Sequence, residues 1–113
     1  MKLVIIESPY AGDVAKNIEY ARAAMRDSLK RGEAPMASHL LYTQPGILDD
    51  DLMGERLLGI KAGFAWSTRA DLTAVYADLG ISDGMKIGIR TAEINGRPIE
   101  YRSLTGQTTG PSA

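Results

Sequence analysis

Apolar and polar residues follow two periods along the chain, one typical of buried strands and one typical of amphipathic helices. Residues 3–6 (LVII) are an unbroken aliphatic run, which is typical of a strand covered on both faces of a parallel sheet. Over residues 13–31, apolar positions recur every three or four residues with charged residues between them, which predicts a helix. Asp13 suits its N-cap, and Gly32 suits the position that follows its C-terminus.

The remaining chain continues this alternation of strands and helices. We predict a short strand over residues 34–37, a helix over 52–68, a strand over 71–76, a helix over 82–92 and a strand over 97–101. With right-handed crossovers, this order predicts an α/β, flavodoxin- or Rossmann-like three-layer fold around a four- or five-stranded parallel sheet.

The segments between and beyond these elements predict the domain limits. Residues 38–51 are predicted to be a long irregular connection, and loops of this length in compact domains are usually functional or mobile. Gly59 and Gly63 lie in a predicted helix and suggest close packing against a neighbour. We expect one domain over residues 1–104 and a disordered tail, rich in Gly, Thr, Ser and Pro, over residues 105–113.

Composition narrows the classes of partner. The 113 residues include 13 basic and 14 acidic ones, giving a net charge of −1 without any basic block, so we expect no nucleic-acid partner. The chain has no cysteine, which excludes a disulfide framework, a thiolate metal site and a thiol nucleophile. The apolar start is too short for a signal peptide or a membrane span, so we expect a cytoplasmic protein with no membrane partner.

Polar residues gather where the predicted strands end. Parallel sheets bind ligands outside the carboxyl ends of their strands, which places residues 7–13, 38–51 and 76–83 around one crevice. Within it, Tyr10 is either a stacking surface or a surface aromatic, and His39 is either a ligand contact or hydrogen-bonded structure. The acidic trio at residues 49–51 is expected to be a solvated turn rather than a metal site.

Three stretches, in this order, resemble a known group of proteins: ESPYAGD, PMASHLLYTQPGILDDD and RADLTAVYADLGISDGMK. Together they resemble the small phage and bacterial relatives of the nucleoside 2-deoxyribosyltransferases, over roughly residues 3–101. The resemblance implies a Rossmann-like domain that binds a nucleoside or nucleotide, usually as a homodimer or larger oligomer. In the enzymes of this group, a carboxylate attacks the sugar C1′ and displaces the base.

The resemblance also implies which residues contact the ligand. The first-strand turn would lie against it, with Tyr10 stacking on a base and Gly12 allowing close backbone approach. Asp71 matches an acidic residue at the start of the third strand, and the helix that begins at Ser82 would offer free N–H groups to a phosphate or sugar hydroxyl. The predicted ligand-binding residues are Glu7, Ser8, Pro9, Tyr10, Gly12, His39, Asp71, Ser82, Asp83, Gly84 and Met85.

One position departs from the group's pattern. The residue that aligns with the nucleophilic glutamate is Gly88, and glycine has no carboxylate to form a glycosyl ester. We therefore predict no catalytic residue, no cofactor and no metal. The predicted function is binding of a nucleotide or nucleotide-derived small molecule without turnover, for example by a phage protein that sequesters a host immune signal such as a cyclic nucleotide or cyclic ADP-ribose.

Two alternatives remain open at this point. One is an active deoxyribosyltransferase or N-glycosidase that uses a relocated carboxylate, for which Glu7, Asp71, Asp78 and Asp83 are the candidates. The other is an interaction protein that kept only the fold. A homo-oligomer is expected in each case, because so small a domain has little depth for a pocket and because Gly59 and Gly63 suggest a packing face. Phe64 and Trp66 are expected in the core or at a subunit interface.

Overall fold

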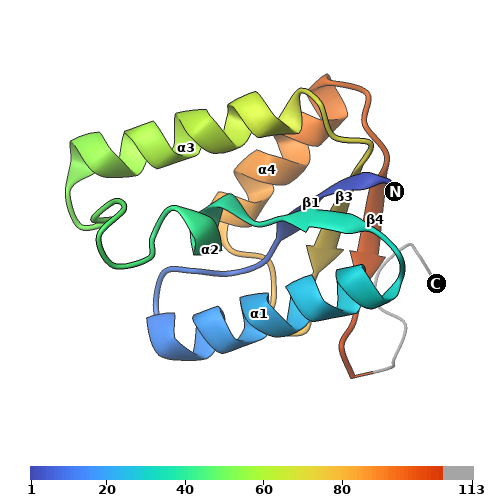
Figure 1. The fold of residues 1–113 in the computed structure, drawn as a ribbon, viewed down its shortest axis with the longest axis horizontal. Coiled ribbons are helices and arrows are strands. Elements are labelled where there is room, and N and C mark those ends of the chain that lie inside the picture. Colours follow the sequence, from blue (N-terminus) through green and yellow to red (C-terminus); the bar gives the residue numbers. More distant parts are fainter. Residues whose placement is uncertain (106–113) are drawn as a thin grey trace.

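The computed structural model describes residues 1–105 as one α/β unit of four strands and four helices (Figure 1). In chain order these are β1 (Leu3–Glu7), α1 (Val14–Lys30), β2 (Ala34–Met36), α2 (Ser38–Leu41), α3 (Met53–Ser67), β3 (Leu72–Tyr76), α4 (Asp83–Ile94) and β4 (Ile99–Arg102). None of the described helices is long and apolar enough to cross a membrane.

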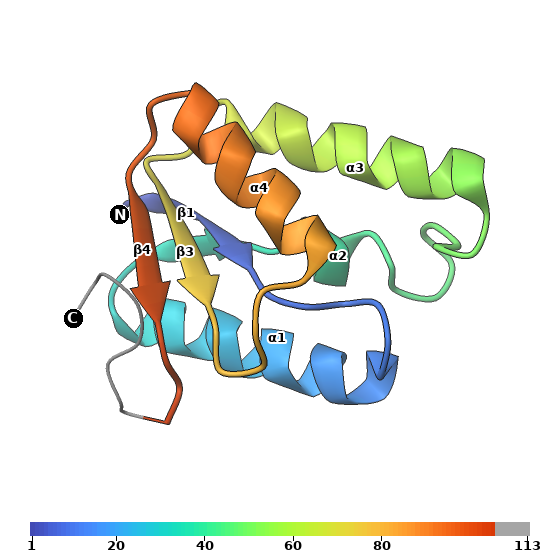
Figure 2. The ribbon, with the colours of Figure 1, turned by 180° about the vertical axis from the view of Figure 1, so that it is seen from behind.

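The four strands form one parallel sheet in the order β2-β1-β3-β4. The central pair is set in register by Val4 opposite Leu72 and Glu7 opposite Val75. Helix α1 covers one face of the sheet, and α3 and α4 lie on the other face (Figures 1 and 2). This arrangement confirms the predicted flavodoxin- or Rossmann-like architecture, with four strands.

The predicted caps of two helices are present. The side chain of Asp13 accepts a hydrogen bond from the N–H of Lys16 at 3.2 Å, and Gly32 takes a positive φ of 82° after α1. The hydroxyl of Ser82 accepts from the N–H of Met85 at 3.3 Å, at the start of α4. These caps satisfy N–H groups that the first helical turn leaves without partners.

The structure corrects the prediction in two segments. The connection over residues 38–51 is not wholly irregular, because α2 forms its first turn. The last strand begins at Ile99 rather than at residue 97, since Pro98 has no N–H for the ladder. Of the predicted tail, residues 106–113 lie outside the described part of the chain.

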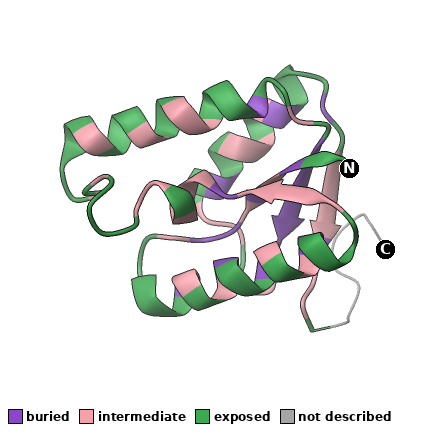
Figure 3. Cartoon of the chain, in the orientation of Figure 1, coloured by how far each residue is buried: buried purple, intermediate pink, exposed green. Residues whose placement is uncertain are grey.

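The main hydrophobic core lies between the sheet and α1. Successive residues of a strand face opposite sides, so Val4 and Ile6 of β1 point into this core, together with Ala74 and Tyr76 of β3. Their neighbours Ile5 and Glu7 are only partly buried and line a cavity on the other face. Figure 3 shows β3 buried along its whole length, with the outer faces of the helices exposed.

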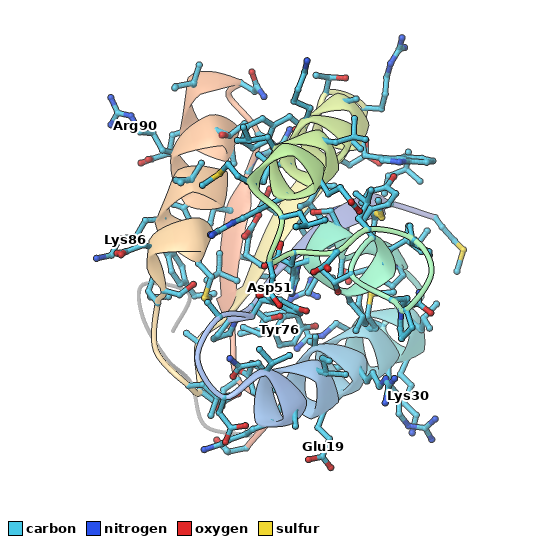
Figure 4. The ribbon with its side chains drawn as sticks, turned by 90° about the vertical axis from the view of Figure 1, so that its left-hand side faces the viewer. Glu19, Lys30, Asp51, Tyr76, Lys86 and Arg90 are labelled. Carbon is cyan, nitrogen blue, oxygen red and sulfur yellow. The ribbon has the colours of Figure 1, made fainter. Side chains whose placement is uncertain are left out.

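A buried ion-pair cluster joins the end of β4 to the start of β2. Both terminal nitrogens of Arg102 donate to the carboxylate of Glu33, at 2.8 and 2.7 Å, and one of them also donates to the hydroxyl of Tyr76 at 3.1 Å. Tyr76 lies in the interior of the molecule (Figure 4) and donates to Asp27 of α1. The cluster therefore ties α1, β2 and β4 together.

Candidate functional site

A cavity of about 610 Å³ lies over the sheet face opposite α1, between α3 and α4. Its lining follows α4 from Ser82 and Asp83 at the start of the helix to Thr91 near its end, which corresponds to about 12 Å along the axis. The volume is within the range of small-molecule sites. The cavity thus extends from the carboxyl edge of the sheet across its face.

Most of the predicted ligand-binding residues line this cavity. They are Glu7, Ser8, Tyr10, Gly12, His39, Ser82, Asp83, Gly84 and Met85. Two others do not: Pro9 is buried beside it, and Asp71 lies at the opposite edge of the sheet, where it accepts a hydrogen bond from the N–H of Leu3 at 2.8 Å. Asp78, a candidate for a relocated carboxylate, does not line the cavity either; it accepts hydrogen bonds from Tyr20, Ser103 and Leu104.

The turn after β1 is held in place by one side chain of α1. The amide nitrogen of Asn17 donates to the main-chain oxygens of Tyr10 and Ala11, at 2.9 and 3.0 Å. Asn17 is itself buried. This pair of bonds fixes a turn that would otherwise be a flexible connector, and so positions Tyr10 on the cavity wall.

Glu7 occupies the space that a side chain at position 88 would need. A Cβ atom built on Gly88 would lie 2.0 Å from Oε2 of Glu7, far inside van der Waals contact. The carboxyl group at this place in the cavity is therefore supplied by β1 instead of α4. The sequence pattern around Gly88 could not show this contact, because the two residues are 81 positions apart.

The Glu7 carboxyl is held in its neutral form. Burial raises the pKa of Glu7 from its usual 4.5 to about 8, although the positive charge of Arg97 acts in the opposite direction. Within residues 1–105, no hydrogen bond or ion pair to this carboxyl is formed. At pH 7 the group is therefore mostly protonated and can donate a hydrogen bond into the cavity.

Ser8 and His39 form a polar pair on the cavity wall. Oγ of Ser8 lies 2.6 Å from Nε2 of His39. Burial lowers the pKa of His39 to about 4, so the imidazole is neutral at pH 7. The contact joins the turn after β1 to α2, and it leaves both side chains at the cavity surface.

Helix α3 supplies a wall that the sequence did not indicate. Gly59, Ile60, Gly63, Phe64 and Ser67 all line the cavity, as does Arg97 from the turn before β4. A Cβ on Gly63 would lie 2.6 Å from Oγ of Ser38, so this glycine allows α2 to approach α3 closely. The predicted close packing is confirmed, but it occurs within one chain and gives no support to self-association.

The two aromatic residues near the end of α3 lie outside the chain's core. Phe64 is partly exposed on the cavity wall, whereas Trp66 is 55% exposed and does not line the cavity. Nε1 of Trp66 donates to the hydroxyl of Tyr42 at 2.8 Å. The prediction of a core position is therefore wrong for both; a subunit interface stays a prediction.

The fold is that of a Rossmann-like α/β domain, and its cavity extends from the carboxyl end of β1 along α4. By sequence, the chain belongs to the family named domain of unknown function DUF7768, whose model matches residues 2–102. No curated protein matches the chain.

A solved structure shares the fold. The structure of a 2-deoxyribosyltransferase from the psychrotolerant bacterium Bacillus psychrosaccharolyticus aligns with 96% of this chain and 77% of that chain, with a TM-score of 0.63 and 20% sequence identity. At this identity the match shows a common fold. The resemblance found in the sequence is confirmed to that extent.

Proposed function

We propose that this protein binds a nucleoside or a nucleotide-derived small molecule in the cavity between α3 and α4, without turning it over. The observation that carries the proposal is the cavity itself, of about 610 Å³, which lies at the carboxyl end of β1 and at the start of α4. Its place in a fold shared with a deoxyribosyltransferase supports a nucleoside-like ligand.

The cavity wall offers suitable contacts to both the base and the sugar of a nucleoside. Tyr10 from the turn after β1 and Phe64 from α3 both offer aromatic surface to the cavity, and aromatic rings bind bases by stacking. Ser8 and His39 offer a hydroxyl and a neutral imidazole to sugar hydroxyls. Apolar walls with a few polar groups are typical of small-molecule sites.

The absence of turnover follows from the chemistry at position 88. Gly88 has no carboxylate, and the carboxyl that fills its space belongs to Glu7 and is mostly protonated at pH 7. A protonated carboxyl is a poor nucleophile. Holding a ligand intact would suit the capture of a nucleotide signal, of the cyclic nucleotide or cyclic ADP-ribose type, by a phage protein that suppresses host defence.

A second candidate function, catalysis, rests on the contact between the Glu7 carboxyl and Gly88. Because the Glu7 carboxyl takes the place of a residue-88 side chain, its ionised fraction would attack the sugar C1′ and displace the base in an N-glycosidase or deoxyribosyltransferase reaction. This enzyme would become more active as the pH rises through about 8 and Glu7 ionises. The pH dependence distinguishes it from a binding protein.

The test combines binding with recovery of the ligand. Purified protein is mixed with nucleosides, nucleotides, cyclic nucleotides and cyclic ADP-ribose derivatives, its melting temperature is measured, and the bound molecule is released by heat and analysed by chromatography. We expect one class to raise the melting temperature and to return intact. No stabilisation by any of them would contradict the proposal and favour an interaction protein.

Variants locate the binding and test for catalysis. Phe64→Ala should weaken binding, whereas Trp66→Ala on the same helix, outside the cavity, should not. Glu7→Gln keeps a neutral side chain that can donate a hydrogen bond, so a binding protein should retain its ligand. Release of free base by the wild type, lost in Glu7→Gln, would instead establish the enzyme.

A further inference from the structure

Arg97 is a buried cation in the wall of the cavity. It belongs to the turn between α4 and β4, and its residue is 8% exposed. Nε donates to Oγ1 of Thr73 at 2.9 Å, and Nη1 donates to the main-chain oxygen of Ser67. Both acceptors are uncharged, so these bonds orient the guanidinium without neutralising it.

The guanidinium has donors to spare. Arginine carries five N–H donors, and the two bonds to Thr73 and Ser67 use two of them, which leaves three. In the described part of the chain, Arg97 forms no ion pair with any carboxylate. A buried charge without a counter-charge is unfavourable, and this one borders an open cavity.

The nearest acid does not supply the counter-charge. Glu7 is the group whose charge acts on Arg97, but burial raises the pKa of Glu7 to about 8. At pH 7 the floor of the cavity therefore holds one cation and one mostly neutral carboxyl. The Arg97 guanidinium and the protonated Glu7 carboxyl can both donate hydrogen bonds, so this part of the cavity suits a negatively charged group.

The other charged groups that line the cavity belong to the loop before α3, to the first turn of α3 and to the start of α4. The loop before α3 contributes Asp50, and the first turn of α3 contributes Glu55 and Arg56. Asp83 is the first residue of α4. Both Arg56 and Asp83 are exposed. His39 is neutral because burial lowers its pKa to about 4. Lys86 and Arg90 of α4 point away from the cavity, into solvent (Figure 4).

We propose that the ligand carries an oxyanion, as a phosphate or carboxylate group, and that this group binds Arg97 with the Glu7 carboxyl as a second donor. The rest of the molecule then extends along α4 toward Tyr10 and Ser82. The inference rests on the proposed function for the nucleoside part of the ligand and adds its charge and its orientation. The acidic end then lies at Arg97, and the base lies toward the start of α4.

The experiment compares matched neutral and acidic ligands. Thymidine and 2′-deoxyadenosine are each titrated by calorimetry against their 5′-monophosphates and 5′-carboxylates, with inorganic phosphate alone as the minimal probe. We expect the acidic member of a pair to bind at least tenfold more tightly than the neutral one. A preference for phosphate over carboxylate, or the reverse, identifies the source of the oxyanion.

Variants assign the preference to Arg97. Arg97→Met should remove it, whereas Arg56→Met, which removes an exposed arginine from the rim of the same cavity, should leave it. Arg97→Lys, which keeps the charge, should retain part of it even if Arg97→Met proves unstable. A preference that survives in a folded Arg97→Met variant, or equal binding of neutral and acidic ligands, would overturn the proposal.

The pH profile provides a readout that a purely structural Arg97 would not change. As the pH rises from 7 to 9, Glu7 ionises and repels the oxyanion, so affinity for the acidic ligands should fall by tenfold or so, while the neutral nucleosides change little. Glu7→Gln should abolish that fall.

The outcomes also separate this inference from the proposed function. If nucleosides bind regardless of charge, only the oxyanion site is wrong. If inorganic phosphate binds in an Arg97-dependent way but no nucleoside or nucleotide does, only the nucleoside assignment is wrong. Absence of all binding would contradict both.

Discussion

Two buried arginines lie at the two ends of β4, and they are paired in opposite ways. Arg102, at the end of the strand, is 4% exposed and donates to Glu33, Glu100 and Tyr76. Arg97, just before the strand, is 8% exposed and donates only to a hydroxyl and a main-chain carbonyl. One arginine is paired with carboxylates, and the other lines the cavity.

Their acidic neighbours differ in the same sense. Hydrogen bonds from Arg102 hold the pKa of Glu33 below its usual range, so Glu33 is ionised. Burial raises the pKa of Glu7, so Glu7 is mostly protonated beside Arg97. On the α1 side of the sheet the charged groups are paired and link the elements of the fold, whereas on the other side Arg97 lines the cavity and has no ion pair with a carboxylate of the described residues.

The largest effect on stability is expected from Arg102→Met. Removing one partner of a buried ion pair costs about 3–5 kcal/mol, and here it would leave Glu33, whose side chain is 13% exposed, without its counter-charge. Urea denaturation measures the loss. Arg31→Met, which removes a partly exposed arginine from its pair with Asp27, should cost less than about 1 kcal/mol. Similar losses in both variants would show that the Arg102 cluster contributes no more to the free energy of unfolding than an exposed ion pair does.

A pH-dependent effect of intermediate size is expected from Glu7. Its pKa of about 8 in the folded protein lies above the usual 4.5, so the folded state keeps a proton that the unfolded state has lost. Stability should therefore fall as the pH rises, by at most about 1.4 kcal/mol per pH unit, until Glu7 ionises in the folded protein as well. Urea denaturation between pH 6.5 and 8.5 should show this slope in the wild type and not in Glu7→Gln.

His39 and Glu33 provide controls for the assignment of this pH slope to Glu7. His39, with its pKa lowered to about 4, gives a slope of the opposite sign, but only below its usual pKa of 6.5. Glu33→Gln should change the slope only in acid, because a carboxyl with a lowered pKa loses its contribution as the pH falls through the folded pKa. A slope between pH 6.5 and 8 that persists in Glu7→Gln would contradict the prediction.

A smaller loss of stability is expected from Arg97→Met. The variant leaves one hydroxyl and one carbonyl without a donor but strands no carboxylate, so the expected cost is about 1–2 kcal/mol. The same denaturation experiment measures it. A loss as large as that of Arg102→Met would make Arg97 a structural cation and remove the contrast between the two ends of β4.

The smallest effect is expected from Gly88→Ala. The new methyl group would displace the Glu7 carboxyl, which is the end of a flexible side chain, so the cost is about 1 kcal/mol. Gly84→Ala on the same helix meets nothing closer than 4.0 Å and should instead gain about 0.5 kcal/mol from helix propensity. In the double variant with Glu7→Ala, the cost at position 88 should disappear.

The sequence predicted one half of the candidate site better than the other. The turn after β1 and the start of α4 were identified because both follow strands, and ligands bind at the carboxyl ends of parallel strands. The α3 wall and Arg97 were missed because the cavity continues from that edge across the sheet face. A single arginine at the start of a predicted strand gives no sign that it is buried, and the Glu7–Gly88 contact joins residues far apart in the chain.

Helices and strands were predicted correctly where the repeating hydrophobic pattern extends over enough residues to distinguish a helix from a strand. Helix α1 and strand β3 have nearly the expected bounds, because 17 residues of helical period and five buried strand residues leave little ambiguity. Helix α2 was missed because four residues are barely more than one turn and carry no period. Gly63 was correctly linked to close packing, but its partner Ser38 was visible only in three dimensions.

The position of β1 in the sheet has a consequence for how the chain folds. β1 precedes the other three strands in the chain, yet it lies in the centre of the sheet, and its contact with the start of β3 joins residues 68 positions apart. Contacts of such long range close slowly. On the ribosome, β1 can pair only with β2 until most of the chain has emerged. Glu7 is therefore exposed to water and ionised until α4 packs on the sheet. Because burial then raises the pKa of Glu7 to about 8, we expect the last stage of folding to take up a proton.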